Sequence, residues 1–80
     1  MKVKSEKLKV VHTEKKEGHS EKYNMDYNFT LLYANTEQGI QEQIVVNNEF
    51  ADKLEKGKSI QIVYQLGFRN RAKIVAIEQL

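Results

Sequence analysis

Large apolar side chains alternate with polar ones along a run of eleven residues in the first half of the chain. Positions 23, 25, 27, 29, 31 and 33 are apolar or aromatic, whereas positions 24, 26, 28 and 30 are polar. A period of two residues matches a β-strand, whose side chains point alternately to opposite faces, and not a helix, whose period is 3.6. The run predicts a long strand over 23–34 with one apolar face. On that face we expect three residues in the core: Met25, Phe29 and Leu31.

The length and composition predict one small domain over residues 1–80. Hydrophobic residues make up 40% of the chain, which is enough for a compact core. A domain of this size buries only about 60% of the surface that its unfolded chain exposes, so its stability is modest. Cysteine is absent, which excludes a disulfide framework and a cysteine-ligated metal site.

The sequence favours a cytoplasmic protein with no membrane partner. Lysines and glutamates interrupt the first residues, where a secretory signal needs an unbroken apolar stretch. No later stretch approaches the length of a membrane-spanning segment, about 18 apolar residues.

The net charge of +2 is unevenly distributed. Residues 1–22 carry seven lysines and four glutamates, 23–57 carry two lysines and six acids, and 58–80 carry four basic residues and one glutamate. Both ends are therefore basic and the middle is acidic. This pattern fits a basic face formed by the two ends, and it also fits a solvated surface with balanced charges, which is the commoner case.

Two strands are predicted to flank the long one. Residues 7–13 alternate with Leu8, Val10 and His12 on one side, and the polar stretch 14–22 predicts a loop. After a turn at 35–39, the chain returns as a strand over 40–46, so the second and third strands form a hairpin.

The second half begins with a predicted helix over 47–57. Asparagine precedes it, acids lie in its first turn and lysines in its last, and Gly57 suits its end. Its apolar residues are expected to cover one side of the core: Phe50, Ala51 and Leu54.

Two further strands, 59–66 and 71–80, follow the helix and are joined by a turn at 67–70. Apolar residues occupy consecutive positions in the last strand, which predicts burial on both faces or a bulge.

The predicted order is three strands, a helix and two strands. An OB-fold has this order, with five strands in a Greek-key barrel. We therefore expect a mainly β protein, a small five-stranded OB-fold-like barrel closed at one end by the helix. An SH3-like barrel or an open antiparallel sheet packed on the helix stays an alternative, because loop lengths do not separate these folds.

Part of the second half resembles a known family. The segment Phe-Ala-Asp-Lys-Leu-Glu-Lys-Gly-Lys-Ser-Ile-Gln-Ile (50–62), followed by Arg71 and 74–76, is similar to the second half of bacterial single-stranded-DNA-binding proteins. In that family a short helix ends in Leu-x-Lys-Gly, and a β-branched strand, a basic turn and a last strand follow. The resemblance covers about 30 of the 80 residues and implies an OB-fold and single-strand binding. The tryptophan that this family stacks against bases is absent.

No pattern in the sequence predicts catalysis, a cofactor or a metal site. The two histidines, His12 and His19, lie in no nucleophile–base motif. The sequence also contains no phosphate loop, dinucleotide fingerprint or metal-ligand spacing. We therefore expect a binding protein rather than an enzyme.

Single-stranded nucleic acid is the first predicted partner. Proteins hold single strands with aromatic platforms and with basic side chains along the backbone. In an OB-fold the loop between the first two strands and the loop between the last two flank the binding face, and the basic side chains predicted as contacts lie in or next to these two loops. Phe68 stands out because it lies in a glycine-containing turn next to Arg69 and Arg71. The predicted contact residues are Phe68, Arg69, Arg71, Lys73, Lys15, Lys16, Lys22, Tyr23 and Tyr33.

The alternative is a protein-interaction module or accessory subunit with no nucleic-acid role. Small barrels commonly offer a strand edge or a loop cluster to another protein, and the acidic middle of this chain favours such a role over phosphate binding. Self-association is a further expectation, since three valines are predicted on outward strand faces: Val45, Val63 and Val75.

Overall fold

The chain forms six strands and two short 3₁₀-helices in a computed structural model, which describes residues 1–80 apart from the side chain of Asn70. The strands are β1 (Lys2–Lys4), β2 (Leu8–Ser20), β3 (Met25–Asn35), β4 (Gln41–Val46), β5 (Ser59–Leu66) and β6 (Ala72–Gln79). The helices are η1 (Asn48–Lys53) and η2 (Phe68–Asn70). The fold is mainly β, as predicted.

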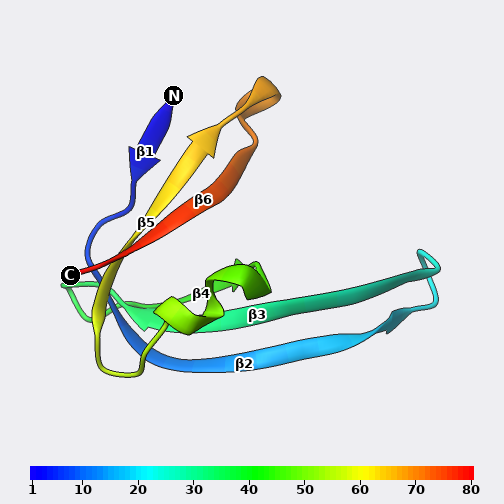
Figure 1. Cartoon of the computed structure of the whole chain (residues 1–80), viewed down its shortest axis with the longest axis horizontal. Coiled ribbons are helices and arrows are strands. Elements are labelled where there is room, and N and C mark those ends of the chain that lie inside the picture. Colours follow the sequence, from blue (N-terminus) through cyan, green and yellow to red (C-terminus); the bar gives the residue numbers. More distant parts are fainter.

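All six strands belong to one antiparallel sheet. β5 pairs with β1 and β2 along one edge and with β6 along the other, while β2 pairs with β3 and β3 with β4. No pairing joins β4 to β6 in the described part of the chain, so the sheet is not closed into a barrel. The prediction of a closed five-stranded barrel is corrected accordingly. The sheet stays open because the hairpins β2–β3 and β5–β6 leave their common corner in different directions (Figure 1).

The sixth strand, β1, lies before the predicted first strand and is separated from β2 by residues 5–7. The Ser5 amide donates to the Ile62 carbonyl at 2.8 Å, and the Ile62 amide donates to the Ser5 hydroxyl oxygen at 2.9 Å. The serine side chain thus replaces a backbone group of the ladder. β1 consequently lies beside the outer half of β5, and β2 begins beside its first residues, with Leu8 opposite Ile60.

β2 is longer than predicted and changes face within its length. It continues to Ser20, so the predicted loop 14–22 is reduced to a turn at 21–24. A register shift between Val10 and His12 marks a bulge. The extra residue turns His12 to the face opposite Val10, so the prediction that the two share a side is wrong.

β3 contributes to the core through the face opposite to the predicted one. Leu32 and Ala34 are fully buried, and Thr30 is also buried. Residues 31–34 are apolar on both faces of the strand, so alternation alone does not decide which face the rest of the protein covers. The first half of β3 projects beyond the body of the molecule (Figure 1). The predicted core position is therefore wrong for three residues: Met25, Phe29 and Leu31.

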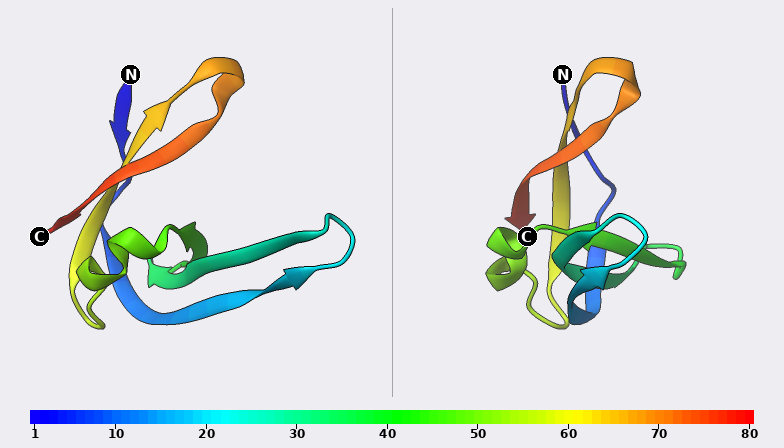
Figure 2. Two further views of the ribbon diagram at one scale, coloured as in Figure 1. Left: turned by 45° about the vertical axis from the view of Figure 1, so that its right-hand side comes forward. Right: turned by 90° about the vertical axis from the view of Figure 1, so that its right-hand side faces the viewer.

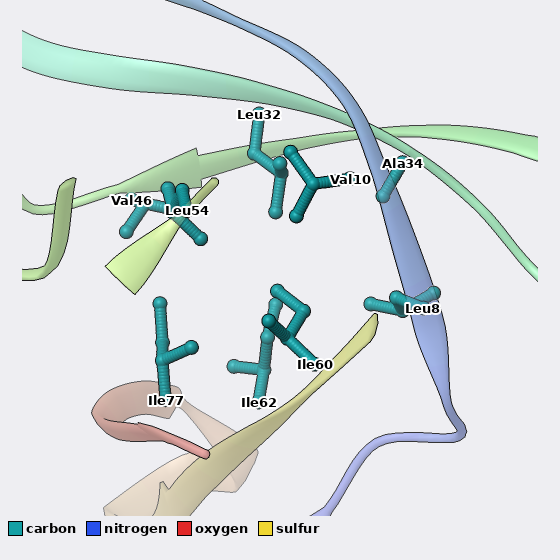
Figure 3. Close-up of a cluster of buried hydrophobic side chains, with 9 residues drawn as sticks. All are labelled: Leu8, Val10, Leu32, Ala34, Val46, Leu54, Ile60, Ile62 and Ile77. Atoms are coloured by element: carbon teal, nitrogen blue, oxygen red, sulfur yellow. The ribbon is translucent and has the colours of Figure 1, made fainter. Parts of the chain in front are cut away.

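Nine buried side chains form the core, which lies between the β2–β3–β4 part of the sheet and the β5–β6 part (Figure 3). Because the sheet folds over at its corner, its two parts act as the two layers that bury apolar surface against each other. The nine residues are Leu8, Val10, Leu32, Ala34, Val46, Leu54, Ile60, Ile62 and Ile77.

The helix predicted over 47–57 is a shorter 3₁₀-helix, η1, over six residues. Asn47 precedes it without a side-chain capping hydrogen bond. Leu54 is buried and Phe50 packs against the core, but Ala51 is exposed. The predicted apolar trio is therefore reduced to two residues, because η1 ends at Lys53 and the chain leaves helical geometry at Leu54, so Leu54 does not continue a helical face with Ala51.

Side-chain amides hold η1 to β3. The Thr30 hydroxyl donates to Asn48 Oδ1 at 2.8 Å, and Asn48 Nδ2 donates to Asn28 Oδ1 at 2.7 Å. η1 also lies against β6, where Gln79 Nε2 donates to the Lys53 carbonyl at 3.3 Å. The helix thus connects the two parts of the sheet on the side where β4 and β6 do not pair (Figure 2).

Both predicted hairpins are confirmed. β3 and β4 are joined by a turn in which Gly39 has a φ of +85°, a conformation that favours glycine. β5 spans the predicted residues 59–66 and pairs with β6. A register shift leaves Val75 as an extra residue in β6, which confirms the predicted bulge. Of the other two valines predicted to face outward, Val45 is 58% exposed, whereas Val63 is only 7% exposed.

Candidate functional site

The most exposed aromatic side chain lies in the turn between β5 and β6, which we call the β5–β6 tip (66–73). The Gly67 amide closes this turn by donating to the Arg71 carbonyl at 2.8 Å. Arg69 adopts left-handed backbone angles, φ 61° and ψ 35°, which cost a non-glycine residue about 1 kcal/mol or more. Phe68 is 86% exposed. The turn therefore holds a bare phenyl ring in solvent at the end of the hairpin.

Basic side chains surround this ring. The guanidinium carbon of Arg69 lies 5.6 Å from the centroid of the Phe68 ring, within the range of a cation–π contact. Beside them is an open concavity of about 510 Å³. Its lining residues are Gln65, Gly67, Phe68, Arg69, Arg71 and Lys73.

The hairpin that carries the tip has a strongly positive surface. Residues 60–77 include three basic side chains and no carboxylate. β1 lies against the same hairpin and adds Lys2 and Lys4. Glu78 is the nearest acid along β6, and its carboxylate pairs with Lys4 at 3.0 Å. An anion that approaches the tip therefore meets an excess of positive charge.

The other predicted basic residues lie on the β2–β3 hairpin. Lys15 and Lys16 are exposed residues of β2 rather than of a loop, and Lys22 lies in the turn, with its ammonium group 5.3 Å from the centroid of the Tyr23 ring. Lys16 Nζ pairs with Glu14 Oε2 at 2.9 Å. This hydrogen-bonded ion pair lowers the pKa of the Glu14 carboxyl and raises the pKa of the Lys16 amine. Lys16, which is one of the predicted phosphate contacts, is thus already paired with the Glu14 carboxylate.

The structure separates the two groups of predicted contacts. The tip residues Phe68, Arg69, Arg71 and Lys73 lie together, whereas Lys15, Lys16, Lys22 and Tyr23 lie towards the end of the other hairpin. The two hairpins diverge from their common corner, so their ends lie apart (Figures 1 and 2). The expectation that these two hairpin ends flank one binding face is therefore wrong. The long, straight β2–β3 hairpin carries its end well beyond the corner that it shares with β5.

A second aromatic surface lies on the outer face of β2 and β3. The sequence did not indicate this surface, because periodicity predicts Phe29 and Leu31 in the core. We call it the outer face: His12, Tyr27, Phe29, Leu31 and Tyr33. The rings of His12 and Tyr33 stack with centroids 5.7 Å apart, and those of Tyr27 and Phe29 lie 6.0 Å apart. Tyr27 is 45% exposed. The length of the alternating run could have indicated this exposed surface, because a strand this long in an 80-residue chain extends past the core.

Neither a metal centre nor a membrane-spanning helix is found among the described residues. No three histidine, cysteine, aspartate or glutamate side chains in them are grouped so that they could hold a metal ion. None of the helices in the described chain has the length and apolar character needed to cross a membrane.

Comparison with known proteins gives no match: no protein-family model, curated protein or solved structure is similar enough to this chain to be reported as a relative. The resemblance of 50–62 to single-stranded-DNA-binding proteins therefore stays a prediction. Any functional assignment depends on the geometry of the site.

Proposed function

We propose that this chain is a non-catalytic, OB-like binding module that holds single-stranded nucleic acid at the β5–β6 tip, weakly and with little sequence preference. The observation that carries the proposal is Phe68, an 86% exposed ring beside three cations and a concavity, with no carboxylate among residues 60–77.

The order of the strands supports an OB-like fold. β1 and β2 can be counted as one strand that is interrupted at Ser5. This combined strand pairs with β5 on one side and with β3 on the other, and the helical segment η1 separates β4 from β5 along the chain. An OB-fold is a partly open five-stranded barrel in which the loop between the last two strands contributes to ligand binding. The β5–β6 tip is the equivalent loop in this chain.

The chemistry of the tip suits an unpaired strand. A base stacked on an exposed aromatic ring contributes about 1–3 kcal/mol, and every base offers a flat face, so this contact is tolerant of sequence. Arg69, Arg71 and Lys73 supply the charge that phosphates need. A duplex hides its base faces, so the ring favours a single strand.

Fluorescence anisotropy with a labelled single-stranded oligonucleotide at low salt tests the proposal. We expect binding in the micromolar range that is typical of non-specific contacts. Phe68→Leu, which keeps the bulk but loses the ring, should weaken binding by about tenfold, whereas Phe68→Tyr should preserve it. The absence of binding at tens of micromolar protein would overturn the proposal.

A second candidate function is protein binding through the outer face. This surface is apolar and aromatic but nearly neutral, because Glu14 lies between His12 and Lys16 and contacts both, at 3.3 and 2.9 Å. Such a surface suits a protein better than a polyanion. A stoichiometric partner that survives nuclease treatment in a pulldown, and that is lost in Tyr27→Ser, would favour this function.

A further inference from the structure

β4 has a free edge. It pairs with β3 along one side, and no strand or other backbone hydrogen bond occupies its other side in the part of the chain that is described. A free strand edge presents a row of amide and carbonyl groups that another extended backbone can pair with. The edge lacks the lysines and prolines that commonly protect such edges, since β4 reads Gln-Glu-Gln-Ile-Val-Val.

A crevice with a partly apolar and partly polar wall lies beside this edge. Its volume is about 280 Å³, slightly below the about 300–1,000 Å³ of small-molecule pockets, so it suits one or two side chains better than a cofactor. Ile44, Tyr64 and Ile74 contribute half-buried apolar surface to it, and the only charged residue on its wall is Lys73. The complete lining is Ile44, Val45, Asn47, Tyr64, Ala72, Lys73 and Ile74.

We propose that the free edge of β4 and this crevice form a docking site for an extended peptide of a partner protein. The peptide adds a strand to β4, places one apolar side chain in the crevice, and carries a carboxylate next to that side chain. Backbone pairing at a sheet edge combined with a pocket for a single side chain is a recurring mode of peptide recognition. Lys73 attracts the carboxylate by charge complementarity, whereas the Glu42 carboxylate of β4, which acts on Tyr64, disfavours it at that side of the crevice.

A second copy of this chain does not supply such a peptide. The peptide is an unpaired extended segment, whereas the extended apolar segments of a second copy already belong to its sheet and the segments between strands are mainly polar or charged. The free edges of a second copy, at β4 and β6, would give a dimer instead, which the test below distinguishes. The proposal is distinct from nucleic-acid binding, because it depends on β4 and the crevice, whereas the nucleic-acid proposal depends on Phe68 and Arg69; Lys73 is the residue that the two sites share.

The test uses a synthetic pool of short peptides in which leucine, isoleucine or phenylalanine is flanked by glutamate, added to the isotope-labelled full chain. We expect amide shifts and slowed hydrogen exchange along β4 and at residues 72–74. Alternate amides of a strand point to opposite edges, so the decisive control is a pair of N-methylated pools, each methylated at one of the two alternate sets. Methylation of one set should abolish binding, and methylation of the other should leave it intact.

Two substitutions locate the side-chain contacts. Ala72→Phe should fill the crevice and abolish peptide binding, and because Ala72 is exposed the fold is retained. Lys73→Glu should weaken binding of the acidic pool by about tenfold, whereas Lys56→Glu, also at an exposed lysine, should not.

Four results would overturn the proposal: no binding of the pool, equal binding of both methylated pools, protection of β4 in a concentration-dependent dimer without peptide, or the same β4 shifts on addition of a single-stranded oligonucleotide.

Discussion

The ring of Tyr27 lies directly over Gly18 on the neighbouring strand. The two residues are opposite each other in the β2–β3 register, and a Cβ atom added to Gly18 would lie 2.5 Å from the tyrosine hydroxyl oxygen and 2.7 Å from the adjacent ring carbon. Only a residue without a side chain lets the ring lie flat at this position. The contact covers a bare stretch of backbone in a part of the hairpin that the core does not reach.

Gly18→Ala should move this ring without unfolding the protein. The atoms that would clash are at the far end of a flexible side chain, and the hairpin end lies outside the core, so the free energy of unfolding should change by less than about 0.5 kcal/mol. In the unaltered protein the α-protons of Gly18 should show an upfield ring-current shift in the NMR spectrum. Tyr27→Leu should remove this shift, and Tyr23→Leu should leave it. An unshifted Gly18 in the unaltered protein would contradict the contact.

Leu31 and Leu32 form a matched pair that tests which face of β3 is the core. Leu32→Ala should lower the free energy of unfolding by about 2–5 kcal/mol, because Leu32 is fully buried, or should abolish cooperative unfolding. Leu31→Ala should cost about 1 kcal/mol. Urea denaturation measures both values. Equal losses, or a larger loss for Leu31, would show that the core lies on the other face.

Residues 31–34 also show how far the sequence could predict the fold. Periodicity located β3 to β6 to within two residues, and β5 to the residue, because alternation depends only on local backbone geometry. It missed β1 and the second half of β2, which is polar and was predicted to be a loop. It could not choose between two apolar faces of one strand, since that choice depends on which distant segments cover it. Periodicity also could not predict the bulge before His12, where one extra residue moves every later side chain of β2 to the opposite face of the sheet.

Asn48 is expected to stabilise the fold more than its neighbour Asn47. Asn48→Ala leaves the buried Thr30 hydroxyl without its partner, which should cost about 1–2 kcal/mol. Asn47 is exposed and makes no capping hydrogen bond, so Asn47→Ala should change stability by less than about 0.5 kcal/mol. Thermal and urea unfolding of the two variants measure the difference. A larger loss for Asn47→Ala would mean that η1 is held by a cap and not by β3.

Tyr64 should make the stability of the protein sensitive to alkaline pH. Burial, and secondarily the Glu42 carboxylate, raise the pKa of its phenol above the ordinary value of about 10. The folded state therefore holds this proton more tightly than the unfolded state. Protonated Tyr64 therefore contributes to the free energy of unfolding. This contribution is fully present below pH about 10 and is lost as the pH rises through the raised pKa of Tyr64.

Two measurements check this behaviour. In a spectrophotometric titration one of the four tyrosines should ionise after the others, and Tyr64→Phe should remove that late step. Tyr64→Phe should also reduce the loss of stability between neutral and alkaline pH. A late step that persists in Tyr64→Phe would assign the raised pKa to another tyrosine.

The candidate site was predictable at the β5–β6 tip and not elsewhere. Phe68 could be identified because a local turn that contains Arg69 and is followed by Arg71 exposes its ring whatever the rest of the chain does. The position of Lys15 and Lys22 relative to that ring could not be predicted. It depends on the angle between the two hairpins, and the packing at their shared corner determines that angle.

The salt dependence of oligonucleotide binding tests the central claim most directly. For single strands the logarithm of the binding constant falls with the logarithm of salt concentration with a slope of about −0.7 for each phosphate neutralised, so three tip cations predict a slope of about −2. The double variant Arg69→Gln/Arg71→Gln should reduce the slope to about −0.7, whereas Lys53→Gln/Lys56→Gln, which removes the same charge beside η1, should leave it near −2. Equal slopes for both double variants would contradict a site at the β5–β6 tip.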